Sequence, residues 1–146
     1  MTGRWWDGGA VLGPRTFAVT RADLVAYAHA SGDQNPIHQD EQVALAVGLP
    51  GVIAHGMLTL GLVARAVEEW TDATPVLELG AKFTQPVVVP AEGAAEVAVT
   101  GTVKAVAEGR LTLALEVTCG GHKVLGMPKA VLDLPAASDS SGAARG

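Results

Sequence analysis

The sequence contains a single cysteine, Cys119, in 146 residues. One cysteine excludes a framework of internal disulfide bonds and fits a reducing compartment. Positive charge is also scarce, because ten Lys and Arg residues stand against fifteen Asp and Glu, for a formal net charge of −5. A nucleic-acid binder needs a basic face toward the phosphates, and no run of Lys or Arg offers one. We therefore expect neither a nucleic-acid partner nor a membrane-surface helix.

Long uninterrupted apolar runs are missing as well. A membrane-spanning helix needs about 20 consecutive apolar residues, and no uninterrupted stretch here reaches that length. The first residues, MTGRWWDGGAVLGP, lack the apolar core of a secretory signal peptide. These absences predict a protein that is soluble and cytoplasmic.

The composition is that of a folded chain. Hydrophobic residues make up 49% and charged residues 17%, which argues against intrinsic disorder. The length fits one domain with a real core, which we place at residues 1–135. The end of the chain is small and polar, so we expect a disordered tail over residues 136–146.

The first part of the chain predicts one strand followed by short helices. Apolar and polar residues alternate over 15–20, and the spacing of Thr20 and Asp23 is that of a helix capping box. Gly32 then supplies a helix stop. Because Pro36 disfavours helical geometry in the residue before it, we expect residues 33–38 to be an extended or turn segment.

Asp40 can cap a second helix over residues 41–47, which Gly48 would end. A third helix is predicted over 55–70, and it is apolar on almost every side, as in a helix buried on most of its circumference.

From residue 76 onward the apolar period changes to two, which predicts β-strands. Pro128 within the last strand indicates a bulge or an edge position. Cys119 continues the apolar face of one strand, which favours a buried structural thiol over a nucleophile. Helices followed by strands indicate an α+β fold, in which a curved antiparallel sheet wraps around the long helix and dimerisation covers an edge. The four strands are expected at 76–84, 95–106, 110–119 and 123–134.

A possible reaction centre lies in the segment SGDQNPIH, where Asp33 and His38 are separated by a proline-stiffened stretch. Such a segment can aim an Asp and a His at one point, where they can exchange protons with carbon and oxygen. Ser31 and Asn35 could orient them. The alternative is that these residues are good turn formers and nothing more. Spacing alone leaves both interpretations open.

The segment AHGM begins the third helix, so backbone N–H groups near Gly56 lack intrahelical partners and the positive end of the helix dipole points outward. A glycine there lets a ligand carbonyl approach closely, which suits a developing oxyanion such as a thioester enolate. Alternatively, Gly56 eases the turn into the helix. For His55 we favour a helix-capping or core-edge position over a catalytic one.

The stretch YAHASGDQNPIHQDEQVALAVGLPGVIAHGML resembles, in order and spacing, the signature of the MaoC-like (R)-specific hydratases and dehydratases. That resemblance implies a hotdog domain, a catalytic pair of Asp33 and His38, and an oxyanion donor in the Gly56 N–H. Ser31, Asn35 and His55 become supporting positions. The chain length and the segment FTQPVVVP further resemble the catalytic subunit of actinobacterial 3-hydroxyacyl-ACP dehydratases.

The activity that this resemblance implies is hydration of trans-2-enoyl thioesters, or dehydration of (3R)-hydroxyacyl thioesters, carried by CoA or acyl-carrier protein. It requires no metal and no redox cofactor. Asp33, His38, Asp40 and His55 are metal-ligand types, but they match no short ligand motif. The expected partner is a second hotdog subunit, in a homodimer or a heterodimer. The alternatives are activity only with such a partner, an acyl-thioester hydrolase, or a non-catalytic acyl-binding subunit.

Overall fold

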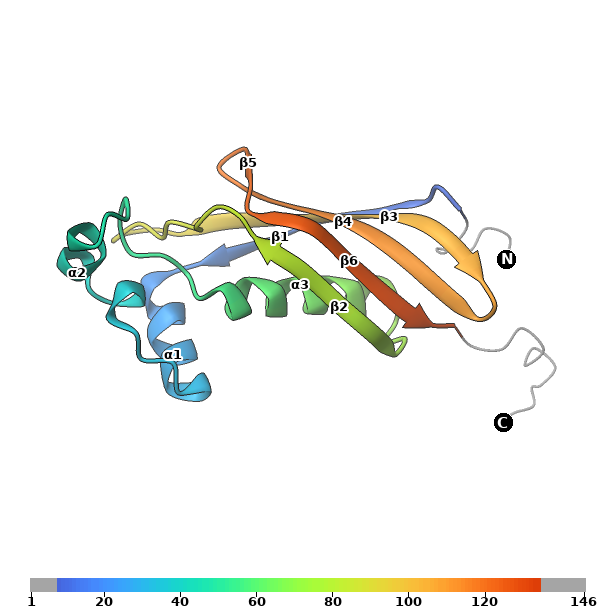
Figure 1. Ribbon diagram of the computed structural model, residues 1–146, viewed down its shortest axis with the longest axis horizontal. Coiled ribbons are helices and arrows are strands. Elements are labelled where there is room, and N and C mark those ends of the chain that lie inside the picture. Colours follow the sequence, from blue (N-terminus) through green and yellow to red (C-terminus); the bar gives the residue numbers. More distant parts are fainter. Residues whose placement is uncertain (1–7, 135–146) are drawn as a thin grey trace.

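A six-stranded antiparallel sheet forms the frame of the protein in a computed structural model that describes residues 8–134 (Figure 1). The strand order is β1-β3-β4-β6-β2, and β5 is a short partner of β4. Every pair of neighbouring strands is antiparallel, as the run of separate alternating segments predicts. The strands are β1 (Val11–Val19), β2 (Val76–Phe83), β3 (Ala95–Ala107), β4 (Arg110–Cys119), β5 (His122–Lys123) and β6 (Leu125–Asp133).

Tight turns join the long strands where the sequence has its glycines. Glu108 and Gly109 between β3 and β4, and Gly120 and Gly121 after β4, all have positive φ. Two consecutive residues with positive φ match the twist of antiparallel strands. The expected tail over residues 136–146 lies outside the described residues, and that prediction stays open.

Pro128 lies at a bulge in β6. Met127 before it has φ +49°, and the pairing of β2 with β6 shifts register between Gly80 and Lys82. A bulge accommodates a residue that cannot donate to the ladder. Since β6 pairs with β4 on one side and β2 on the other, the bulge interpretation is confirmed and the edge interpretation is wrong.

Four helical segments precede β2, and their ends follow the predicted caps: α1 (Arg21–Ser31), η1 (Pro36–His38), α2 (Glu41–Ala46) and α3 (Gly56–Trp70). Thr20 and Asp23 form the reciprocal capping box, and Gly32 ends α1 with φ +83°. The Asp40 carboxylate accepts two backbone N–H groups at the start of α2. The segment 33–38 is only partly extended, because its last residues close a 3₁₀ turn.

Helix α3 runs along one side of the sheet (Figure 1). Its fully buried positions form a single stripe at helical spacing, Thr59, Val63, Ala66 and Val67. The expected burial over most of the circumference is therefore too broad: Met57 is 58% exposed, and most other positions are half-buried. The core lies between this stripe and the inward faces of β3, β4 and β6. Cys119 is half-buried at its margin, and burial raises the pKa of its thiol.

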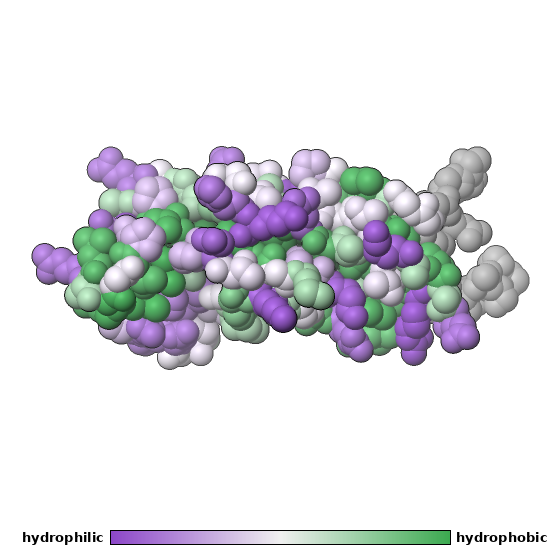
Figure 2. Space-filling view, turned by 45° about the horizontal axis from the view of Figure 1, so that its top comes forward, coloured by the Kyte–Doolittle hydropathy of each residue, from purple (hydrophilic) through white to green (hydrophobic). Residues whose placement is uncertain are grey.

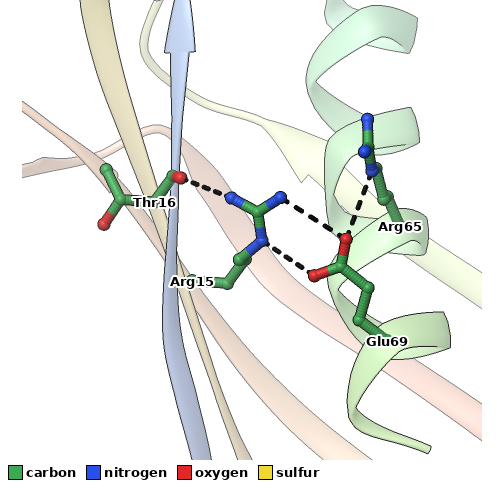
Figure 3. Close-up of polar contacts among 4 residues, drawn as sticks. All are labelled: Arg15, Thr16, Arg65 and Glu69. Atoms are coloured by element: carbon green, nitrogen blue, oxygen red, sulfur yellow. Dashed lines mark hydrogen bonds and ion pairs between the residues drawn. The ribbon is translucent and has the colours of Figure 1, made fainter. Parts of the chain in front are cut away.

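The C-terminal half of α3 is fastened to the sheet by an ion-pair network (Figure 3). Arg15 of β1 donates from Nε to Glu69 of α3 at 2.8 Å and from Nη1 to the Thr16 carbonyl at 2.7 Å. Arg65 reaches the same carboxylate at 3.3 Å. The hydrogen bond from Arg15 lowers the pKa of Glu69. The contact of Arg15 with Glu69 crosses from strand to helix and so ties α3 to β1.

The surface is mixed, with an apolar area at the end of the molecule that carries α1 and α2 (Figure 2). Leu45 and Val47, 51% and 63% exposed, are among the apolar side chains of that end. Among the helices of residues 8–134, none combines the length and the apolar character needed to cross a membrane.

Candidate active site

A cavity of about 600 Å³ lies where α1, the loop after it, the start of α3 and the segment after β2 meet. Five of the six predicted site residues line it: Ser31, Asp33, His38, His55 and Gly56. Asn35 does not. The remaining walls are mostly apolar and come from Tyr27, Ile53, Ala54, Met57, Thr59, Phe83, Thr84, Gln85, Pro86, Val87, Val124 and Leu125.

A ladder of side chain to backbone hydrogen bonds shapes the loop that carries Asp33. The Ser31 hydroxyl accepts the Asp33 N–H at 3.1 Å, and the Asp33 carboxylate accepts the Asn35 N–H at 3.2 Å. Asn35 in turn accepts the Ile37 N–H at 3.2 Å and caps the 3₁₀ turn. Ser31 therefore supports Asp33 from within the cavity wall, whereas Asn35 shapes the loop from outside it.

His38 is 6% exposed, and its ring orientation is fixed by one strong hydrogen bond. Nδ1 lies 2.7 Å from the carbonyl oxygen of Ile53. A carbonyl can only accept, so Nδ1 carries the proton and the neutral ring keeps a lone pair on Nε2. Such a nitrogen can take a proton from a bound water. Asp33, by contrast, is exposed.

His55 lies between these two residues. It is 2% exposed, its Nε2 is 3.2 Å from the Asp33 carbonyl oxygen, and its ring stacks on that of His38 with centroids 3.8 Å apart. The Tyr27 ring also packs against the His55 ring, with the two ring centroids 4.7 Å apart. His55 is the N-cap residue of α3, as expected for a helix-capping position, although its side chain makes no cap hydrogen bond. The pKa of His55 is lowered, chiefly by burial.

Gly56 is the first residue of α3, so its N–H belongs to the turn that has no intrahelical acceptor. The aromatic ring of Phe83, at the end of β2, lies directly against it. A β-carbon at position 56 would stand 2.9 Å from Phe83 Cε1 and 3.0 Å from Cζ. A side chain at position 56 would therefore require the Phe83 ring to move.

Some wall residues were outside the predicted site. Tyr27 falls within a predicted helix and Phe83 within a predicted strand, and neither is among the predicted site residues. Both reach the cavity because segments distant in sequence fold together there. The aromatic character of each residue was the one available signal, and it does not distinguish a cavity wall from a core position.

Three of the four potential metal-ligating residues noted in the sequence lie close together in this cavity. Asp33, His38 and His55 each place one ligand atom within 4.8 Å of the others, whereas the Asp40 carboxylate is committed to the α2 cap. The stacked imidazoles already use His38 Nδ1 and His55 Nε2 on carbonyl oxygens. Each ring therefore keeps one nitrogen that is not engaged with a carbonyl oxygen.

A long helix on an antiparallel sheet, in this order of strands, is the architecture of the hotdog fold. Residues 8–119 match the MaoC-like domain family, and the chain belongs to that family. Solved structures agree. A MaoC-like dehydratase superimposes with a TM-score of 0.86 at 32% identity, covering 88% of this chain and 41% of that one. The (R)-hydratase from A. caviae involved in PHA biosynthesis gives 0.78 at 25% identity, covering 88% and 97%.

Among curated proteins, 3-hydroxyacyl-thioester dehydratase X of Mycobacterium tuberculosis is 39% identical over 74 residues, which are 50% of this chain. The match covers 25% of that relative's length. The HadBC complex of the same organism, a 3R-hydroxyacyl-ACP dehydratase, has a TM-score of 0.66 at 14% identity, over 85% of this chain and 94% of that one. At that identity the likeness shows the fold alone.

Proposed function

We propose that the protein catalyses the reversible (R)-specific hydration of trans-2-enoyl thioesters. The observation that supports it is that Asp33, His38 and the start of α3 at Gly56 line one cavity. The pair offers a base and an acid, and the helix start offers a hydrogen-bond donor for a carbonyl. Relatives named hydratases and dehydratases add support from outside the chain.

The reaction follows from these groups in the hydration direction. The Gly56 N–H donates to the thioester oxygen and stabilises the enolate that forms there. His38 Nε2 takes a proton from a water held against the Asp33 carboxylate, and the hydroxide adds at C3. The proton taken from water is returned to C2, so one water is added across the double bond. In reverse, the pair removes the C2 proton and protonates the leaving hydroxyl.

The substrate class follows from the cavity walls. Val87, Val124 and Leu125 are buried apolar residues of the cavity wall, which suits an acyl chain. The carrier, CoA or acyl-carrier protein, stays open, because both present the same thioester to the site. The chemistry needs no cofactor.

The direct test uses a short trans-2-enoyl-CoA and follows the loss of conjugated-enoyl absorbance. Asp33→Asn and His38→Gln are expected to reduce the rate by roughly 100- to 10,000-fold. Matched controls are Asp72→Asn, in an exposed turn, and His29→Gln, on the exposed face of α1. Equal rates for the wild type and both site variants would rule out the pair. Thiol release without a 3-hydroxyacyl product would identify a hydrolase instead.

For the partner we propose a second copy of this chain, paired along β2. This strand ends the sheet, so its outer edge has no neighbour within the described chain. Leu77 and Phe83 on it are 48% and 56% exposed, although both fall on the predicted apolar face. Antiparallel pairing of two copies about Gly80 would set Glu78 opposite Lys82 of the partner subunit. Opposite charges in facing positions stabilise such a pair.

The alternative partner is a different hotdog subunit, as in the HadBC complex, whose fold this chain shares. In that case the isolated chain would be monomeric, and hydratase activity would appear only after the other subunit is added. Measuring the mass of the purified protein in solution separates the two arrangements before any activity is assayed.

A further inference from the structure

His55 contacts both members of the Asp33–His38 pair. Its ring nitrogen Nε2 meets the Asp33 carbonyl oxygen at 3.2 Å, and its ring stacks on His38 at 3.8 Å with an interplanar angle of 25°. Its own carbonyl accepts the N–H groups of Leu58 and Thr59 at 3.0 and 3.2 Å. A single residue thus joins the acid/base loop to the first turn of α3.

The hydrogen-bond partners of His55 determine its protonation. Nε2 faces a carbonyl oxygen and must carry a proton. Nδ1 is out of contact with solvent and has no hydrogen-bond partner among residues 8–134. A second proton on Nδ1 would create a buried charged N–H without an acceptor, which is strongly unfavourable.

Some groups around the His55 ring lower its pKa and others raise it. Burial lowers the pKa most, and the neighbouring His38 lowers it further, while the hydrogen bond to Asp33 and the Asp33 carboxylate raise it. Tyr27 is the other aromatic ring in contact with His55, and it carries no part of this shift. The net effect is a lowered pKa, which favours the uncharged imidazole.

We propose that His55 is a positioning residue that works as a neutral imidazole with its proton on Nε2. Resting on the hydratase function proposed above, the inference assigns His55 two tasks. Its N–H holds the backbone of Asp33, whose side chain is exposed on a loop. Its ring holds the plane of His38, so that Nε2 of His38 keeps facing the cavity.

Two variants separate these tasks. His55→Gln keeps an N–H donor and removes the ring, whereas His55→Phe keeps a ring and removes the donor. Because displacing a reacting group by about 1 Å can cost 100-fold in rate, we expect kcat to fall roughly 10- to 100-fold in each variant. KM should change little, since His55 holds the pair and not the acyl chain. His122→Gln, on an exposed strand end, is the control.

Nitrogen NMR of the protein labelled in its histidines tests the protonation without any substrate. We expect His55 to show the neutral tautomer with the proton on Nε2 at neutral pH, and to take up a second proton only below its ordinary pKa of 6.5. His55 resonances are assigned by their loss in His55→Gln. Titration of His55 at or above its ordinary value of 6.5, or a proton on Nδ1, would overturn the proposal.

The two measurements also separate the proposal from the proposed function. An active wild type with equally active His55→Phe and His55→Gln variants would refute positioning and leave the hydratase assignment intact. An inactive wild type would refute the hydratase assignment, and the NMR result would still decide whether His55 is neutral and held by Asp33.

Discussion

The ring of Phe83 covers the α-carbon of Gly56, so closely that a β-carbon on residue 56 would stand 2.9 Å from it. Gly56 begins α3 and Phe83 ends β2. The start of α3 is therefore packed against an aromatic side chain from the edge strand. The two residues act as one packing unit, and a substitution at either position should be felt at the other.

Gly56→Ala should destabilise the protein by about 1 to 3 kcal/mol, because the added methyl group collides with the Phe83 ring. The same substitution in a Phe83→Ala background should cost much less, since the ring is gone. Denaturant unfolding of the wild type, both single variants and the double variant measures this coupling. An equal loss of stability in both backgrounds would show that the ring is not the reason for the glycine.

The stability of the fold should depend on pH through His55. Its folded pKa is lowered, so below the ordinary value of 6.5 the unfolded chain binds a proton that the folded chain does not. The free energy of unfolding should therefore be fully retained above that pH and decrease as the pH falls toward the folded pKa. Urea unfolding at several pH values, compared with His55→Phe, isolates this contribution. The expected result is a smaller pH dependence in the variant.

A charge exchange on β2 tests the proposed pairing of two copies. Glu78→Lys and Lys82→Glu should each weaken the dimer, because each places like charges in facing positions. The double variant restores opposite charges across the same axis and should recover the dimer. Light scattering after size exclusion, over a range of protein concentrations, gives the dissociation constant. Recovery of the dimer in the double variant is expected only if the two copies pair about Gly80. If the double variant stays monomeric, the interface lies elsewhere.

Asn35→Ala should lower stability by about 1 kcal/mol through loss of the cap on the 3₁₀ turn. Asn35→Asp should retain the cap, because its carboxylate can accept the Ile37 N–H. The comparison is made by thermal unfolding at neutral pH. An alanine variant as stable as the wild type would mean that the hydrogen bond to Ile37 contributes nothing.

The sequence predicted helix ends and strands well, because these features depend on residues that are close together in the chain. The capping box of Thr20 and Asp23, the helix stop at Gly32 and the strand β4 depend on residues within a few positions of one another. The motif in the loop and the AHGM segment likewise brought Asp33, His38 and Gly56 to one cavity.

Contacts between distant segments were not predictable in the same way. The ring of Phe83 on Gly56 and that of Tyr27 on His55 depend on how β2, α1 and α3 approach in space. Neither has a periodic signature. The burial of α3 was overestimated for a related reason: an apolar helix surface shows what can be covered, and the packing of the sheet decides what is covered.

Trp70 ends α3 under two glycines of the sheet, where β-carbons on Gly13 and Gly101 would approach its ring to 2.6 and 3.0 Å. Gly56 stands at the opposite end of the same helix, about 21 Å away at 1.5 Å per residue. A helix of this length is stiff along its axis. Because a β-carbon at either glycine would meet the Trp70 ring, we expect a side chain added there to displace the C-terminal end of α3. The position of the helix that begins at Gly56 thus depends on packing at its other end, at residues that do not line the cavity.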